Sequence, residues 1–123
     1  MSHGIVLFAH GSRDAAWHAP IEAVAARMRA LAPGVRVACA YLELTEPDLA
    51  TAVQALLADG GRAVTVWPMF LGAGRHARED LPRLLDTLRT CHPGITFTLQ
   101  PAIGEHPDVL DTMARTALGE TRR

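Results

Sequence analysis

The chain alternates short apolar runs with longer stretches of helical periodicity, and this alternation constrains its fold more than any other feature of the sequence. The first three runs are nearly continuous in hydrophobic residues, as strands are when helices cover both faces of their sheet. We therefore expect four parallel strands, at Gly4–Ala9, Val35–Leu42, Ala63–Met69 and Ile95–Leu99.

Apolar residues recur at helical spacing in the segments that follow these runs. Four stripes result: Ile21, Val24, Met28 and Leu31; Leu49, Val53, Leu56 and Leu57; Leu81, Leu84, Leu85 and Leu88; and Leu110, Met113, Ala114 and Ala117. We expect Pro47 to open the second helix, and Gly60 with Gly61 to end it. We expect all four stripes to belong to the core.

Right-handed crossovers between parallel strands leave few topologies for such a chain. The commonest for a small unit is an α/β fold of three layers, flavodoxin-like, with a four-stranded parallel sheet in the order 2-1-3-4. Ligands bind such sheets beyond the carboxyl ends of the strands, where the strand order reverses. We expect this crevice between the first and third strands, which end near His10 and just before Gly72–His76.

Composition narrows the class of protein. The chain has 123 residues, 49% of them hydrophobic, which predicts one domain over residues 1–119 with a short polar tail at 120–123. A formal net charge of −1 argues against a nucleic-acid-coating protein. Without a basic leader or an apolar run of about 20 residues, no membrane association is expected, and we predict a cytoplasmic protein. Cys39 and Cys91 are expected to be buried free thiols.

Two histidines follow the strands that border the predicted crevice. His10 begins the segment His10-Gly11-Ser12-Arg13, and His76 ends a glycine-containing segment after the third strand. Neutral imidazole binds intermediate divalent metals and also accepts protons near neutral pH. Two histidines with open coordination positions would hold a metal ion loosely enough to release it. His106 is a weaker candidate that could support these ligands.

Charged and glycine residues accompany the histidines. Arg13, Arg75 and Arg78 could bind an anionic ligand, and either Glu43 or Glu46 could assist in metal binding or proton removal. Gly72 and Gly74 permit backbone conformations closed to other residues, which would let the segment of Phe70, Leu71, Gly72, Ala73, Gly74 and Arg75 approach a ligand closely.

These motifs together resemble the CbiX/SirB-type sirohydrochlorin chelatases, the class II chelatases, in their short single-unit form. The resemblance covers most of the chain. It rests on His10-Gly11-Ser12-Arg13, on Ala40-Tyr41-Leu42-Glu43 with Glu46-Pro47, and on Pro68-x-Phe70-Leu71-x-x-Gly74-x-His76 with Asp80-Leu81-Pro82. Gly104-x-His106-Pro107 is a weaker point of resemblance.

The resemblance implies a lyase that inserts a divalent metal ion into a sirohydrochlorin-type tetrapyrrole. His10 would be metal ligand and proton acceptor, and His76 the second metal ligand. Glu46 and the Phe70–Arg75 backbone would contact the substrate, together with Arg13. Because longer relatives contain two such units, this chain is expected to form a homodimer. No tightly bound cofactor is expected, since the metal is a substrate.

Several alternatives remain open from the sequence. Co²⁺ for cobalamin biosynthesis is the first choice of metal, but Fe²⁺ for sirohaem or Ni²⁺ on the same macrocycle would suit two histidines equally well. A non-catalytic tetrapyrrole or metal carrier is an alternative of another class. A histidine phosphatase is disfavoured because Ala9 stands where the Arg-His-Gly signature of those enzymes has arginine.

Overall fold

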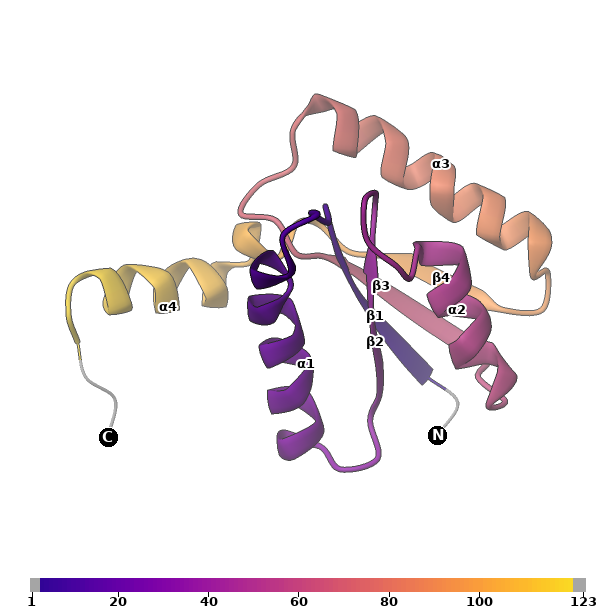
Figure 1. Cartoon of the computed structure of the whole chain (residues 1–123), viewed down its shortest axis with the longest axis horizontal. Helices are drawn as coiled ribbons and strands as arrows, with labels where there is room; N and C mark the ends of the chain where they lie inside the picture. The colour runs from indigo at the N-terminus through magenta and orange to yellow at the C-terminus, as the bar shows by residue number, and fades with distance from the viewer. Residues whose placement is uncertain (1–2, 121–123) are drawn as a thin grey trace.

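The computed structural model describes residues 3–120, with every side chain in that range except that of His76. In chain order its elements are β1 (His3–Ala9), η1 (Ala15–Trp17), α1 (Ala19–Leu31), β2 (Arg36–Tyr41), α2 (Leu49–Ala58), β3 (Ala63–Pro68), α3 (Arg75–Cys91), β4 (Thr96–Leu99), η2 (Ile103–Glu105) and α4 (Pro107–Ala117) (Figure 1). The η elements are single turns of 3-10 helix. Strands and helices alternate as the apolar runs predict.

The four strands form one parallel sheet in the order β2-β1-β3-β4, which confirms the predicted fold class and strand order. The inner strand β1 pairs with β2 up to Ala9↔Tyr41 and with β3 up to Phe8↔Pro68. The strand order reverses between β1 and β3, so the predicted switch point is also confirmed. The loop that begins with His10 leaves the sheet beside the loop that leads into α3.

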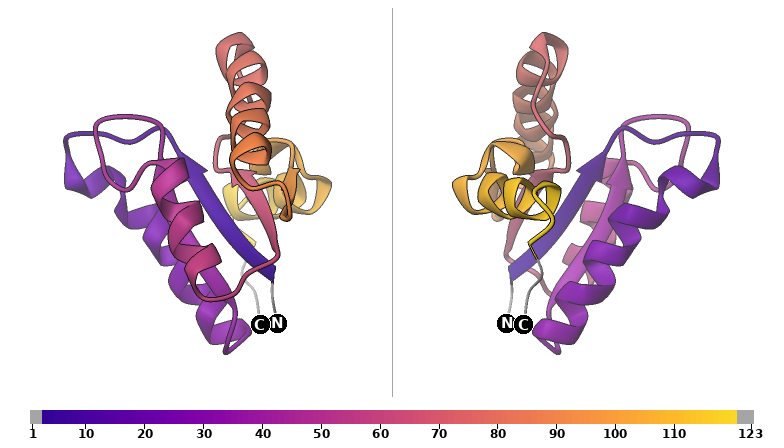
Figure 2. Two further views of the ribbon diagram at one scale, coloured as in Figure 1. Left: turned by 90° about the vertical axis from the view of Figure 1, so that its right-hand side faces the viewer. Right: turned by 90° about the vertical axis from the view of Figure 1, so that its left-hand side faces the viewer.

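Helices cover both faces of the sheet, giving three layers. On one face, α2 and α3 pack over a large cluster that includes Val6, Phe8 and Val66. On the other face, α1 packs over a smaller cluster built around Leu7, Ala25 and Val37. Figure 2 shows α1 and α3 on different sides of the sheet.

The predicted core stripes of α2 and α3 are confirmed. Leu49, Val53 and Leu56 are buried in α2, with Leu57 partly buried, and in α3 Leu81, Leu85 and Leu88 are buried, with Leu84 partly buried. In α1 the prediction is half right: Ile21 and Met28 pack against the smaller cluster, but Val24 and Leu31 are exposed. The residue of α1 that is fully buried is Ala25, whose small side chain lets the helix lie close to the sheet.

The prediction that the stripe of α4 belongs to the core is wrong. Leu110 and Met113 are 51% and 36% exposed, and α4 contains no buried residue. Figure 1 shows the reason: α4 projects away from the sheet, and the element it packs against is the adjoining turn η2. Its apolar face is therefore left largely exposed among residues 3–120.

Three smaller expectations have different outcomes. Cys39 is partly buried, and burial raises the pKa of its thiol, but Cys91 is exposed, so the prediction of two buried thiols is wrong for Cys91. Within residues 3–120 no helix combines the length and apolar character needed to cross a membrane. The predicted polar tail, apart from Glu120, lies outside the described residues.

Candidate functional site

His10 follows β1 directly, and its ring is exposed at the carboxyl edge of the sheet. The imidazole stacks on the ring of Phe70, with 4.4 Å between ring centroids and 26° between ring planes. Phe70 is itself buried, so the imidazole rests on a part of the core. On the other side, the backbone N–H of Glu43 donates to the carbonyl of His10 at 3.1 Å. The histidine is thus held between the loops that follow β2 and β3.

Gly11 brings the first two loops into contact. It has φ +91°, and a Cβ at this position would overlap the carbonyl oxygen of Glu43. Both facts require glycine here. At Gly72 and Gly74, which the sequence marks as permissive positions, neither residue has a positive φ, and open space surrounds the Cβ that each would carry.

A polar network missed by the sequence analysis joins the same two loops. The N–H of Ser12 donates to Thr45 Oγ1 at 3.1 Å, and the Thr45 hydroxyl donates to the Ser12 carbonyl at 2.8 Å. The Nε2 of His18 lies 3.0 Å from that carbonyl and 2.9 Å from Thr45 Oγ1. Because Thr45 is 27 residues from His18, no local pattern pointed to this contact.

Tyr41 lies beneath this network. The His18 ring packs on the Tyr41 ring with 4.9 Å between centroids. Burial, and after it the neighbouring Cys39 and Glu22, raises the pKa of the Tyr41 hydroxyl, which therefore stays protonated. The network thus packs on the buried, neutral side chain of Tyr41.

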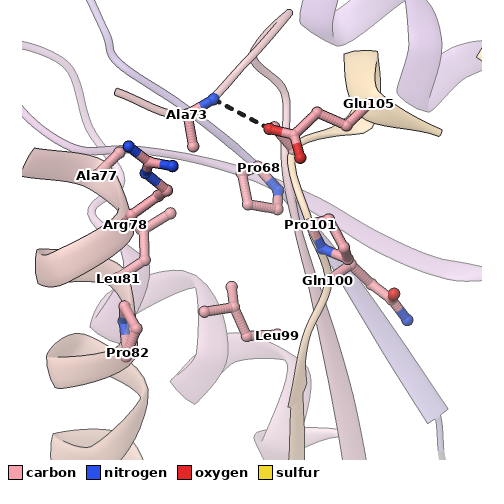
Figure 3. A pocket seen from close by; sticks show the side chains of 11 residues that line it. Pro68, Ala73, Ala77, Arg78, Leu81, Pro82, Leu99, Gln100, Pro101 and Glu105 are labelled. Carbon is pink, nitrogen blue, oxygen red and sulfur yellow. Dashed lines mark hydrogen bonds between the residues drawn. The ribbon is translucent and has the colours of Figure 1, made fainter. Parts of the chain in front are cut away.

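The turn η2 supports the segment Phe70–Arg75, the predicted substrate-binding segment. The N–H of Gly104 donates to the Phe70 carbonyl at 2.9 Å, and a Cβ on Gly104 would overlap the backbone of Leu71. The N–H of Ala73 points to the Glu105 carboxylate at 3.3 Å, as the dashed line in Figure 3 shows. These contacts explain why Gly104 stands at the start of the Gly104-x-His106-Pro107 motif.

A cavity of about 300 Å³ lies between α3 and the end of β4 (Figure 3). Its walls are mostly apolar, and Arg78 and Glu105 are its charged residues; the lining comprises Pro68, Ala73, Ala77, Arg78, Leu81, Pro82, Leu99, Gln100, Pro101, Ala102 and Glu105. It opens beside the segment Phe70–Arg75. Arg78 thus lies where a guanidinium could bind an anionic group near that segment.

The predicted cationic and acidic residues lie in the loops after β1 and β2 and at the start of α3, at the same edge of the sheet. Arg13, Arg75, Glu43 and Glu46 are all exposed. Within the described part of the chain, no carboxylate lies within ion-pair distance of Arg13, Arg75 or Arg78. Such guanidinium groups can bind an incoming anion without first giving up a protein partner.

His76 is the second residue of α3, and its side chain lies outside the described part of the structure. Its backbone follows the strand adjacent to β1, as the switch-point argument requires. The convergence of the two imidazoles therefore stays a prediction. Among the described side chains, no three or more His, Cys, Asp or Glu residues gather in a way that could hold a metal ion.

His106 has a structural role. Its Nδ1 accepts a hydrogen bond from the N–H of Asp108 at 3.1 Å, which caps the first turn of α4. Since the side chain of His76 lies outside the described part of the structure, the interpretation of His106 as a support for the metal ligands stays a prediction. His3, at the opposite end of β1, hydrogen-bonds Thr65 Oγ1 at 2.7 Å and lies away from the site.

Residues 4–118 match the family model for CbiX, which spans nearly the whole described chain. The chain belongs to the CbiX family. A CbiX protein of cobalamin biosynthesis from Marinobacter aquaeolei VT8 superposes on it with a TM-score of 0.83 and 37% identity, covering 96% of this chain and 93% of that one. The predicted family resemblance is confirmed.

Two other relatives carry activities in their names. The chloroplastic sirohydrochlorin ferrochelatase of Arabidopsis thaliana is 29% identical over 89% of this chain, which spans 49% of the plant protein. The sirohydrochlorin cobaltochelatase of Methanocaldococcus jannaschii is 32% identical over 72% of this chain and 62% of the archaeal protein. The CbiX chain described here thus spans about half to three fifths of these relatives.

Proposed function

We propose that this CbiX protein is a metallochelatase that inserts a divalent metal ion into a sirohydrochlorin-type tetrapyrrole. The observation that carries the proposal is the presentation of His10: an exposed imidazole, backed by Phe70 and held by Glu43 at the switch point of the sheet. Relatives named sirohydrochlorin ferrochelatase and sirohydrochlorin cobaltochelatase supply the substrate class.

In this proposal the two histidines share the metal ion. His10 binds it through a neutral ring nitrogen. When the metal passes to the macrocycle, that freed nitrogen accepts one of the two displaced pyrrole N–H protons, and the other passes to water. His76 is the second metal ligand. A metal ion held by two imidazoles keeps open coordination positions, and those are where the pyrrole nitrogens displace water before the metal leaves the protein.

The carboxylate-bearing rim of the macrocycle would bind the exposed guanidinium groups of Arg13 and Arg75. Arg78, at the cavity beside the segment Phe70–Arg75, is placed to take a further carboxylate. The backbone of that segment and the side chain of Glu46 complete the proposed substrate contacts. The supporting turn η2 would keep the segment in place while the substrate binds.

Cobalt is the first choice of metal, and iron and nickel are the alternatives. Imidazole ligands differ little in their preference among these first-row ions. The names of relatives include both cobalt and iron. The metal that the protein inserts fastest is therefore a matter for measurement.

A homodimer is the second part of the proposal. Residues 1–119 would form one CbiX unit, and a second copy would supply the half that the relatives carry in the same chain. The unpartnered apolar face of α4, with Leu110 and Met113 exposed, supports a contact with a second copy. Burying this face against another chain would recover the hydrophobic free energy that the monomer forgoes.

The decisive experiment is an anaerobic metallation assay with sirohydrochlorin and Co²⁺, Fe²⁺ or Ni²⁺ in turn. The absorption of the free macrocycle should decay faster with protein than without it. His76→Ala should lower the rate at least about 100-fold, because losing a metal ligand should cost more than the roughly 10–100-fold lost with a residue that only supports one, while its melting temperature stays near the wild-type value.

The matched control is His92→Ala, because His92 lies at the C-terminal end of α3, far along the helix from His76. That variant should metallate at the wild-type rate. Equal decay with and without the wild-type protein would contradict the chelatase function. Tight macrocycle binding without turnover would instead indicate a carrier.

A further inference from the structure

Leu44 has an unusual backbone conformation close to His10. Among the residues that the structure describes, it is the one non-glycine residue with a positive φ, +64°. This left-handed region is unfavourable for a residue with a bulky side chain, because Cβ comes too near the following carbonyl oxygen. Asparagine and glycine adopt the same conformation at much lower cost.

The side chain of Leu44 also gains nothing from the core, since it is 56% exposed. An apolar side chain held in water on a strained backbone contributes no packing that would offset the strain. The same residue therefore carries two unfavourable features. A contact with a bound ligand would account for both the backbone conformation and the exposure of the side chain.

The residues on either side of Leu44 hold it in position. The N–H of Glu43 donates to the His10 carbonyl, and the Thr45 hydroxyl forms hydrogen bonds with both the N–H and the carbonyl of Ser12. Leu44 is thus fixed between two residues that are tied to the loop carrying His10. The backbone of Leu44 therefore has a defined place beside the loop of His10.

A second exposed leucine lies on the other side of His10. Leu71 is 76% exposed and follows Phe70, the residue on which the His10 ring stacks. The strand order β2-β1-β3 places the loops of Leu44 and Leu71 on opposite sides of the loop of His10. The loop of His10 is therefore flanked by two loops that each expose a leucine, and the exposed Arg13 and Arg75 follow β1 and β3 at the same edge of the sheet.

We propose that Leu44 is a substrate-binding residue that packs on the apolar face of the tetrapyrrole while His10 engages the metal. The inference rests on the proposed chelatase function and adds a contact of a different kind from the charged rim contacts. A flat aromatic-like ring with carboxylates at its rim needs apolar contact at its centre and cations at its edge. The exposed leucines on the loops beside His10 and the exposed arginines at the same edge of the sheet supply contacts of these two kinds.

The test is Leu44→Asn, which removes the apolar side chain and relieves the backbone strain together. The melting temperature should rise by about 2–5 °C, because asparagine tolerates the left-handed conformation. The Kd for metal-free sirohydrochlorin, measured from the change in macrocycle fluorescence, should rise about tenfold, as expected for losing the burial of one leucine side chain. The increase should be the same at low and high salt, since the lost contact is apolar.

The matched control is Leu31→Asn at the C-terminal end of α1, where the leucine is 86% exposed and lies at the opposite edge of the sheet. It should bind sirohydrochlorin as the wild type does. Unchanged affinity in Leu44→Asn, with normal binding and metallation by the wild type, would overturn this inference and leave the chelatase function standing. A lowered melting temperature of Leu44→Asn would assign Leu44 a structural role and overturn the inference. If the wild type sediments as a dimer and Leu44→Asn as a monomer, Leu44 belongs to the subunit interface, which also overturns the inference. Absence of any sirohydrochlorin binding by the wild type would overturn the function itself.

Discussion

At the scale of single residues, the geometry around His10 depends on two close approaches of backbone to backbone. Gly11 lets the loop after β1 touch the loop after β2, and Gly104 lets η2 touch the backbone of Leu71. Both loops that border the imidazole are therefore braced by neighbours where a side chain would not fit. The site is rigid because its supports are main-chain contacts, which cannot change rotamer.

Replacing Gly11 by alanine should lower the free energy of unfolding by about 2 kcal/mol or more, because both the positive φ and the overlap with Glu43 oppose a Cβ there. Gly72→Ala should change it by less than about 0.5 kcal/mol, since nothing lies near the added methyl group. Urea unfolding of both variants measures the difference. Equal destabilisation of the two would refute the assignment of Gly11 as a packing glycine.

At the scale of elements, α2 and α4 begin where a side chain accepts a hydrogen bond from one of the first N–H groups of the helix. The sequence suggests Pro47 as the opening of the second helix, but α2 begins at Leu49 because Asp48 is its N-cap, accepting from the N–H of Thr51 at 2.9 Å. Hydrogen bonding from the Thr51 side chain, and after it from the Thr51 backbone, lowers the pKa of the Asp48 carboxyl. The loop of Leu44 and Glu46 is thereby fixed at its far end.

Asp48→Ala should lower the free energy of unfolding by about 1 kcal/mol near neutral pH. Since the pKa of Asp48 is lower in the folded chain than in the unfolded one, its contribution is complete above the unfolded pKa and is lost as the pH falls through the folded pKa. The difference between wild type and variant in urea unfolding should therefore shrink on acidification. The difference in unfolding free energy between Asp48→Asn and Asp48→Ala should show no such dependence, because asparagine keeps the cap without an ionisable group. A difference between wild type and Asp48→Ala that grew in acid would contradict the capping role.

At the scale of the whole molecule, helices cover one face of the sheet completely and the other face only in part. On the partly covered face α1 packs on β1 and β2, while α4 extends outward from η2 (Figure 1). Trp67, on β3, approaches only the start of this helix, with 6.4 Å between its ring and that of His106. A second copy is the partner that the proposed dimer assigns to α4.

A paired substitution of Leu110→Glu and Met113→Glu should therefore shift the protein from dimer to monomer at micromolar concentration in sedimentation velocity. Thr112→Glu adds one negative charge on another side of α4 and should leave the dimer intact. The monomeric variant should keep its sheet, because α4 contributes no buried residue. A dimer unaffected by the paired substitution would show that α4 has another partner.

The sequence alone predicted the strands, the strand order and two well-packed helices, because hydrophobic periodicity reports directly which side of an element meets the core. It also placed His10 at the switch point, since that position follows from strand order and from where β1 ends. The family was recognised from motifs at the same strand ends, for the same reason. These features depend on residues that are near one another in the chain.

The tertiary structure decided what depends on distant residues. The bracing of Gly11 by Glu43, the hydrogen bonds joining His18, Thr45 and Ser12, and the support of Leu71 by Gly104 all join separate loops, and no periodic pattern encodes such contacts. The direction of α4 is likewise a feature that no periodic pattern in the sequence encodes. Its apolar stripe indicates that the helix buries one side, but only the position of the helix in space shows that this side stays exposed in the described part of the chain.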